Sequence, residues 1–141
     1  MVLDTNQIVA AGTRWIDHGR PSPDPNICRR IVVCVAESHT GLYSGKIIAE
    51  YLEKLVDRNH PPTRTAKLIT YLMGAFTPIS ITSTVAPVRP SDLDDEVFLL
   101  CAIDGYAHYL VSEDNALLDL KASYTPLVIG RSVDLAAALG A

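Results

Sequence analysis

Two aspartates stand directly behind short apolar stretches that predict strands. Asp4 follows Val2 and Leu3, and Asp114 lies just past the apolar stretch that ends at Ser112. Carboxylate oxygens are the ligands that Mg²⁺ and Mn²⁺ prefer in proteins. None of the four histidines is spaced to share a metal ion with another. These acids therefore favour an all-oxygen site for a hard divalent cation, provided that the fold brings them together.

Three further aspartates, Asp92, Asp94 and Asp95, open a segment that is apolar around most of its circumference. The first turn of a helix favours carboxylates as caps and as partners of the helix dipole, so a purely structural role is open for each of them. Taken singly, Asp4 also fits a turn after a strand and Asp114 fits the start of a helix. Taken together, acids behind two strands and at the start of a buried helix favour a metal site.

The elements that must position these acids alternate along the chain. Short apolar stretches predict strands at 2–4, 40–43, 78–81, 108–112 and 126–130. Apolar residues at helical spacing predict helices at 5–12, 27–38, 45–59, 63–76, 91–106, 113–120 and 132–140. Asn26, Ser44 and Ser132 stand where helix caps are expected.

Short apolar strands separated by helices are typical of a parallel sheet covered on both faces. We expect one domain over residues 1–141, an α/β fold built as a three-layer α/β/α sandwich with a central, mainly parallel five-stranded sheet. Functional groups in such folds gather at the carboxyl ends of the strands. Asp4, Asp114 and the start of the helix at 91–106 are therefore expected at one edge of the sheet.

The charge is unevenly divided along the chain. Residues 1–90 carry ten Lys and Arg against seven Asp and Glu, whereas residues 91–141 carry two against nine. A basic half joined to an acidic half suits a phosphate-contacting surface beside a carboxylate-rich metal site, and chance asymmetry of solvated faces explains it equally well.

The bulk composition excludes several classes of protein. No apolar run approaches the roughly 20 residues of a membrane span, so no membrane association is expected. The N-terminal residues lack the features of a signal peptide, which predicts a cytoplasmic protein. Three cysteines without a C-x-x-C pair exclude a disulfide framework and a structural zinc site.

Three stretches and the spacing between them resemble the PIN domain family, and in particular its toxin components of prokaryotic toxin–antitoxin pairs. The stretches are VLDTN at 2–6, YSGKIIAEYLEKL at 43–55 and DLDDEVFLLCAIDGYAHYLVSEDNALLDL at 92–120. The resemblance implies a PIN-like nuclease fold with an acidic pocket. Carried over residue by residue, the pocket acids are Asp4, Glu50, Asp95 and Asp114, with Asn6 and Ser112 as supporting polar residues.

Some of these assignments depend on the resemblance alone. Asp95 is preferred over its neighbouring aspartates because the family's acid precedes a helical alanine by seven positions, as Asp95 precedes Ala102. Glu50 comes from alignment to the family's helix, since Glu50 and Glu53 both lie off the apolar stripe. Glu113 stands where relatives more often carry Gly or a basic residue, and it adds a charge beside the pocket.

The resemblance implies a metal-dependent endoribonuclease that leaves 5′-phosphate and 3′-hydroxyl ends. Asp4, Asp95 and Asp114 would hold one or two Mg²⁺ or Mn²⁺ ions, and Glu50 would be a further ligand or the base that positions water. A small antitoxin protein is the implied partner, and homodimers are common in the family.

The RNA substrate requires cationic contacts to its phosphates. Candidates from the sequence are Arg14, Arg20, Lys46, Arg58, Arg64 and Lys67. Trp15 is a candidate for stacking on an unpaired base.

Two alternatives stay open. The first is a catalytically inactive PIN-like module that binds RNA or protein. The second is a phosphotransfer fold of the haloacid-dehalogenase type, which places a second aspartate two residues after the first, where this chain has Asn6.

Overall fold

The computed structural model describes residues 1–15 and 23–141. Its strands are short, namely β1 (Val2–Leu3), β2 (Leu42–Tyr43), β3 (Thr77–Pro78), β4 (Tyr109–Val111) and β5 (Val128–Gly130). The helices are α1 (Thr5–Gly12), α2 (Ile27–Ser38), α3 (Gly45–Asp57), α4 (Pro62–Ala75), α5 (Glu96–Asp104), α6 (Asn115–Leu118) and α7 (Ser132–Leu139). Two short 3₁₀ helices are η1 (Leu93–Asp95) and η2 (Lys121–Ser123). The predicted α/β class is confirmed.

Every strand pair in the described part of the chain is parallel. β4 lies in the middle of a three-stranded sheet of order β1-β4-β5, in which Val111 faces Leu3 on one side and Gly130 on the other. β2 and β3 pair separately, with Leu42 opposite Thr77. The parallel arrangement places the carboxyl ends of β1 and β4 side by side.

The strands do not pair as the single five-stranded sheet that the sequence predicts. β1 and β2 are joined by a hydrogen bond from Leu42 N to Met1 O (2.8 Å) and by one from the Met1 amino group to Thr40 O (2.7 Å). β3 is two residues long instead of the expected four, and its Pro78 has no N–H to donate to a ladder. The described strands therefore form a three-stranded and a two-stranded sheet that meet at β1 and β2.

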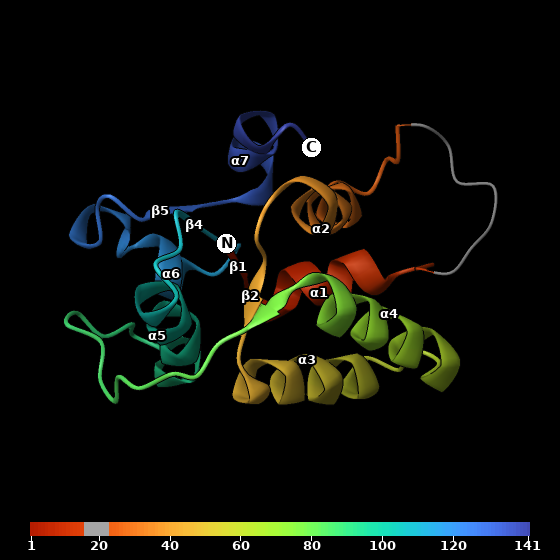
Figure 1. Ribbon diagram of the computed structural model, residues 1–141, viewed down its shortest axis with the longest axis horizontal. Helices are drawn as coiled ribbons and strands as arrows, with labels where there is room; N and C mark the ends of the chain where they lie inside the picture. Colours follow the sequence, from red (N-terminus) through yellow and green to blue (C-terminus); the bar gives the residue numbers. More distant parts are fainter. Residues whose placement is uncertain (16–22) are drawn as a thin grey trace.

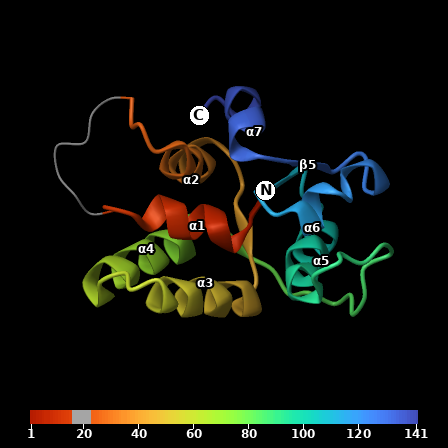
Figure 2. The ribbon, with the colours of Figure 1, turned by 180° about the vertical axis from the view of Figure 1, so that it is seen from behind.

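Helices lie on both sides of the strands. Figures 1 and 2 show α5 and α6 on one side and α1 and α2 on the other, with α3 and α4 beyond α1. α5 packs against β1, β2 and β4, and all of its residues from Val97 to Ala102 are buried. A helix that is apolar around most of its circumference is expected to be buried in this way.

Two of the three predicted helix caps are confirmed. The Asn26 side chain accepts a hydrogen bond from Arg29 N (3.1 Å), and Ser44 Oγ accepts one from Ile47 N (3.2 Å). The prediction for Ser132 is wrong, because Arg131 is the N-cap residue and Ser132 already lies inside α7. The Ser132 hydroxyl is used for another contact, described below.

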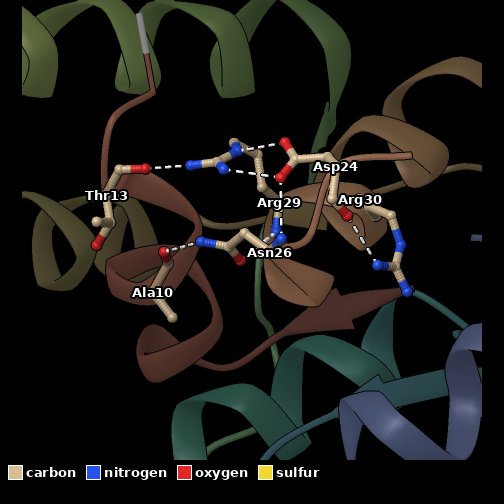
Figure 3. A network of polar contacts seen from close by, with 6 residues as sticks. All are labelled: Ala10, Thr13, Asp24, Asn26, Arg29 and Arg30. Carbon is tan, nitrogen blue, oxygen red and sulfur yellow. Dashed lines mark hydrogen bonds and ion pairs between the residues drawn. The ribbon is translucent and has the colours of Figure 1, made fainter. Parts of the chain in front are cut away.

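A buried ion pair fixes the segment that leads into α2 (Figure 3). The Arg29 guanidinium contacts both carboxylate oxygens of Asp24, at 2.5 and 2.8 Å, and also donates to the Thr13 carbonyl. Asn26 Nδ2 donates to Ala10 O (2.9 Å). These contacts tie the start of α2 to the end of α1, the helix that begins next to Asp4.

Within the described residues, no helix combines the length and the apolarity that a bilayer crossing requires.

Candidate metal centre

Asp4 reaches the carboxyl edge of the sheet because β1 ends immediately before it. Its backbone N–H donates to Val111 O (2.9 Å), which extends the pairing of β1 with β4 by one residue. The side chain is buried, with 3% exposure, and Oδ2 accepts a hydrogen bond from Ser112 Oγ at 2.6 Å. Burial raises the pKa of the Asp4 carboxyl, and the charge of Asp114 adds to this.

Ser112 holds Asp4 and Asp114 next to each other. The hydroxyl of this fully buried residue donates to Asp4 and accepts a hydrogen bond from Asp114 N (2.9 Å). Asp114 Oδ1 accepts a hydrogen bond from Ala116 N (2.9 Å), so this aspartate also caps α6. The cap interaction uses one carboxylate oxygen of Asp114, and the residue still lines the pocket described below.

Asp95 is brought to the same edge by η1. The side chain is buried, with 7% exposure, and among the described residues Oδ2 has no hydrogen-bond partner. Burial is the main cause that raises the pKa of Asp95 to about 8, and its contact with Asp114 and the charge of Asp4 add to it. A buried carboxylate oxygen without a partner is costly, and a bound cation removes this cost.

Glu50 approaches from α3. The neighbouring Tyr51 is fully buried, and its hydroxyl donates to Leu3 O, which fixes α3 against the end of β1. Burial raises the pKa of Glu50, and the Asp4 carboxylate adds to this. Glu53, which the sequence alone could not separate from Glu50, is exposed and does not line the pocket that contains Asp4.

These side chains line one cavity of about 310 Å³, which we call the acidic pocket. Its lining residues are Asp4, Thr5, Asn6, Val9, Glu50, Lys54, Asp57, Arg58, Asp92, Asp94, Asp95 and Asp114. The four predicted acids and Asn6 all lie in this cavity, and Ser112 lies beneath it. The charged side chains in it that can ligate a metal ion are carboxylates, and the lining contains no histidine or cysteine. Such a set of oxygen ligands suits Mg²⁺ or Mn²⁺.

Three carboxylates of this pocket are close enough to share one cation. One oxygen from each of Asp92, Asp95 and Asp114 lies within 4.8 Å of the other two. Mg²⁺ and Ca²⁺ bind oxygens at roughly 2.0–2.6 Å, so oxygens on opposite sides of an ion are about 4–5 Å apart. Among the residues that the structure describes, this is the group of acids whose spacing fits an ion.

Glu113 points away from the pocket, although it adjoins Asp114 in the sequence. Its Oε1 accepts hydrogen bonds from Gln7 Nε2 (3.1 Å), Ser132 N (2.9 Å) and Ser132 Oγ (2.5 Å). The residue therefore links α1 to the start of α7. The unusual acid of the S-E-D-N stretch has a structural role here.

The predicted RNA contacts do not all lie together. Lys46 lines a larger groove of about 900 Å³ beside the acidic pocket, whereas Arg14 and Arg64 line neither cavity. Arg20 lies outside the described residues. The stacking role expected for Trp15 is wrong, because the ring is 8% exposed and packs edge-on against Tyr71 at 5.1 Å between ring centres.

Two cations, Lys54 and Arg58, line the acidic pocket; the sequence singled out Arg58 as a candidate RNA contact and did not single out Lys54. A signal was present, because Lys54 follows Glu50 by four positions and Arg58 follows Lys54 by four. Residues at this spacing share a helix face. The wall of the acidic pocket along α3 and its C-terminal end therefore carries these two cations beside the acids Glu50 and Asp57.

Of three comparisons with known proteins, the one against protein families finds a match. A family model described as PIN domain matches residues 1–116. No curated protein and no solved structure matches the chain.

Proposed function

This chain belongs to the PIN domain family, whose members are generally nucleases, and from that premise we propose that it is a Mg²⁺- or Mn²⁺-dependent endoribonuclease. The observation that carries the proposal is the buried Oδ2 of Asp95, which has no hydrogen-bond partner in the described part of the chain and lies in a pocket that also holds Asp4 and Asp114. Three neighbouring carboxylates repel one another unless cations or protons compensate them. The acidic pocket therefore fits a divalent cation better than it fits a purely structural role.

Each residue of the pocket has a part in this proposal. Asp4, Asp95 and Asp114 would hold one or two ions, and Ser112 links Asp4 to Asp114 by hydrogen bonds to both residues. Glu50 is half-buried, and its raised pKa suits a carboxylate that takes a proton from the attacking water. A divalent ion bound here supplies positive charge to the phosphoryl oxygens and lowers the pKa of water.

The groove beside the acidic pocket offers a path for the RNA strand. It lies along α3 and the segment after β3, and it shares Glu50, Lys54 and Asp94 with the acidic pocket. Lys46 and Lys54 lie on its α3 side, eight residues apart, which is roughly 12 Å along a helix. We expect these lysines to contact phosphates on either side of the cleaved bond.

The biological setting is part of the same proposal. The toxin-like resemblance supports a small antitoxin as the partner, and a homodimer is consistent with the family. Three free cysteines agree with a reducing compartment such as the cytoplasm. We treat residues 1–141 as one nuclease domain, because β5 and α7, beyond the matched stretch, pair with β4 and pack on α2.

Cleavage of labelled single-stranded RNA tests the proposal. We expect cleavage by the wild type in Mn²⁺ and none in EDTA. Asp4→Asn and Asp95→Asn should each lower the rate at least ~100-fold, the loss typical of removing a group that stabilises transition-state charge. Asp119→Asn is the matched control, because it removes an exposed carboxylate that lines neither the acidic pocket nor the groove.

Two results would speak against the proposal. Cleavage that persists in Asp4→Asn and Asp95→Asn would point to a contaminating nuclease. A wild type that binds RNA without cutting it in Mn²⁺ would favour the inactive binding module.

A further inference from the structure

Asp92 caps η1, and its carboxylate also lies near the carboxylates of Asp95 and Asp114. One carboxylate oxygen of each of these three residues lies within 4.8 Å of the other two. Asp4 and Glu50, which belong to the set implied by the family resemblance, are not members of this group. Asp92 thus supplies the third carboxylate of this group, together with Asp95 and Asp114.

The cap interaction of Asp92 leaves a ligand atom available. Its Oδ1 accepts a hydrogen bond from Asp94 N (3.0 Å), at the start of η1. A carboxylate has two oxygens, and the cap interaction uses one of them. Asp94, two residues further on, also lines the acidic pocket but has no oxygen in the three-carboxylate group.

Asp95 gives an independent sign that a ligand belongs at this point. Its side chain is more than nine-tenths buried, and among the described residues its Oδ2 has no hydrogen-bond partner. The charges that surround Asp95 are the carboxylates of Asp4, Asp114 and Asp92. A buried acceptor beside these carboxylates is stabilised by a cation placed among them.

We infer that Asp92 is a metal ligand, the third carboxylate of a cation that Asp95 and Asp114 also hold. The inference rests on the proposed function and extends it to a residue that the sequence assigns to a helix cap. The oxygen separations suit the metal–oxygen distances of hard divalent cations. Asp92 is exposed, so it closes the site on the side of the solvent.

Mn²⁺ binding to the metal-free protein tests this, measured by calorimetry or by the Mn²⁺ spin-resonance signal. Asp92→Asn keeps an oxygen for the cap and removes the anionic ligand, and we expect it to weaken Mn²⁺ binding at least ~10-fold. Asp94→Asn is the matched control, because it removes an equal charge two residues away. It should weaken binding by about 3-fold or less, the effect of one exposed charge.

Failure of the inference about Asp92 and failure of the proposed metal site give different results. Equal losses in Asp92→Asn and Asp94→Asn, or no loss in Asp92→Asn, would overturn the inference while leaving the metal site intact. Asp95→Asn that binds Mn²⁺ like the wild type, or a wild type that binds none, would instead overturn the proposed metal site. Asp92→Ser is a second variant that retains an oxygen for the cap but has no carboxylate. Thermal melting in EDTA shows whether either variant is still folded, so that weaker Mn²⁺ binding can be assigned to the lost ligand.

Discussion

Asp95→Asn should stabilise the metal-free protein at neutral and alkaline pH. Burial first, and then Asp114 and Asp4, raise the pKa of Asp95 from 3.8 to about 8. One pKa unit corresponds to about 1.36 kcal/mol, so an ionised Asp95 that carried the whole effect would cost the fold on the order of 6 kcal/mol. Because the neighbouring carboxylates share the protons of the pocket, replacing Asp95 by neutral Asn should raise the free energy of unfolding by less than this, about 2–3 kcal/mol at pH 8.

The pH dependence has a definite sign. Between pH 4 and pH 8 the Asp95 carboxyl is ionised in the unfolded chain and protonated in the metal-free fold, so the folded state binds more protons. The free energy of unfolding therefore falls as the pH rises through this range. The stabilising contribution is fully present below pH 3.8 and is lost above about pH 8. In Asp95→Asn this contribution to the pH dependence of the free energy of unfolding should be absent.

Thermal and urea denaturation in EDTA measure both effects. A gain of 2–3 kcal/mol corresponds to a rise in Tm of roughly 5–10 °C for a chain of this size. Mn²⁺ should narrow or close this gap, because a wild type with metal at 100 times its Kd gains about 2.7 kcal/mol that the variant cannot gain in full. Asp119→Asn, an exposed acid outside the pocket, is the control. A variant that is less stable than the wild type in EDTA at pH 8 would refute the reasoning.

Three further substitutions test contacts that position the pocket. Ser112→Ala removes the hydroxyl that bridges Asp4 and Asp114, and it should cost about 1–3 kcal/mol in urea denaturation; an unchanged midpoint would contradict the bridging role. Tyr51→Phe leaves the buried Leu3 carbonyl without this donor and should cost about 1–2 kcal/mol, which a wild-type Tm would disprove. Asp24→Ala removes the two hydrogen bonds between Asp24 and the Arg29 guanidinium and should cost about 1.5–3 kcal/mol, whereas an exposed-site change such as Asp134→Ala should stay within about 0.5 kcal/mol; equal costs would contradict a structural role for the pair.

Elements with strong local signals could be predicted from the sequence. The helix at 27–38 has its predicted bounds, because Asn26 supplies the cap and the apolar residues keep helical spacing. Asp4 and Asp114 share an edge because two parallel strands end beside each other, and alternation of strands and helices predicts that arrangement. The continuous helix expected at 91–106 instead begins with η1, which turns Asp95 into the pocket.

Contacts between distant segments could not be predicted. Glu113 adjoins a pocket acid in sequence, but its direction depends on Gln7 and Ser132, which lie far from it along the chain. The choice between Glu50 and Glu53 depends on how α3 is rotated against β1, which tertiary packing decides. Asp92 looks like a cap at the sequence level, and its distance to Asp114 becomes visible only once η1 and β4 are placed in space.

The ends of the RNA products test the central claim most directly. If the acidic pocket activates water for attack on phosphorus, RNA cut in Mn²⁺ carries 5′-phosphate and 3′-hydroxyl ends. Ribonucleases that use the 2′-hydroxyl of RNA as nucleophile leave 2′,3′-cyclic phosphates instead. We predict 5′-phosphate ends from the wild type and no such products from Asp95→Asn. Cyclic phosphate ends, or identical products from both proteins, would contradict the account.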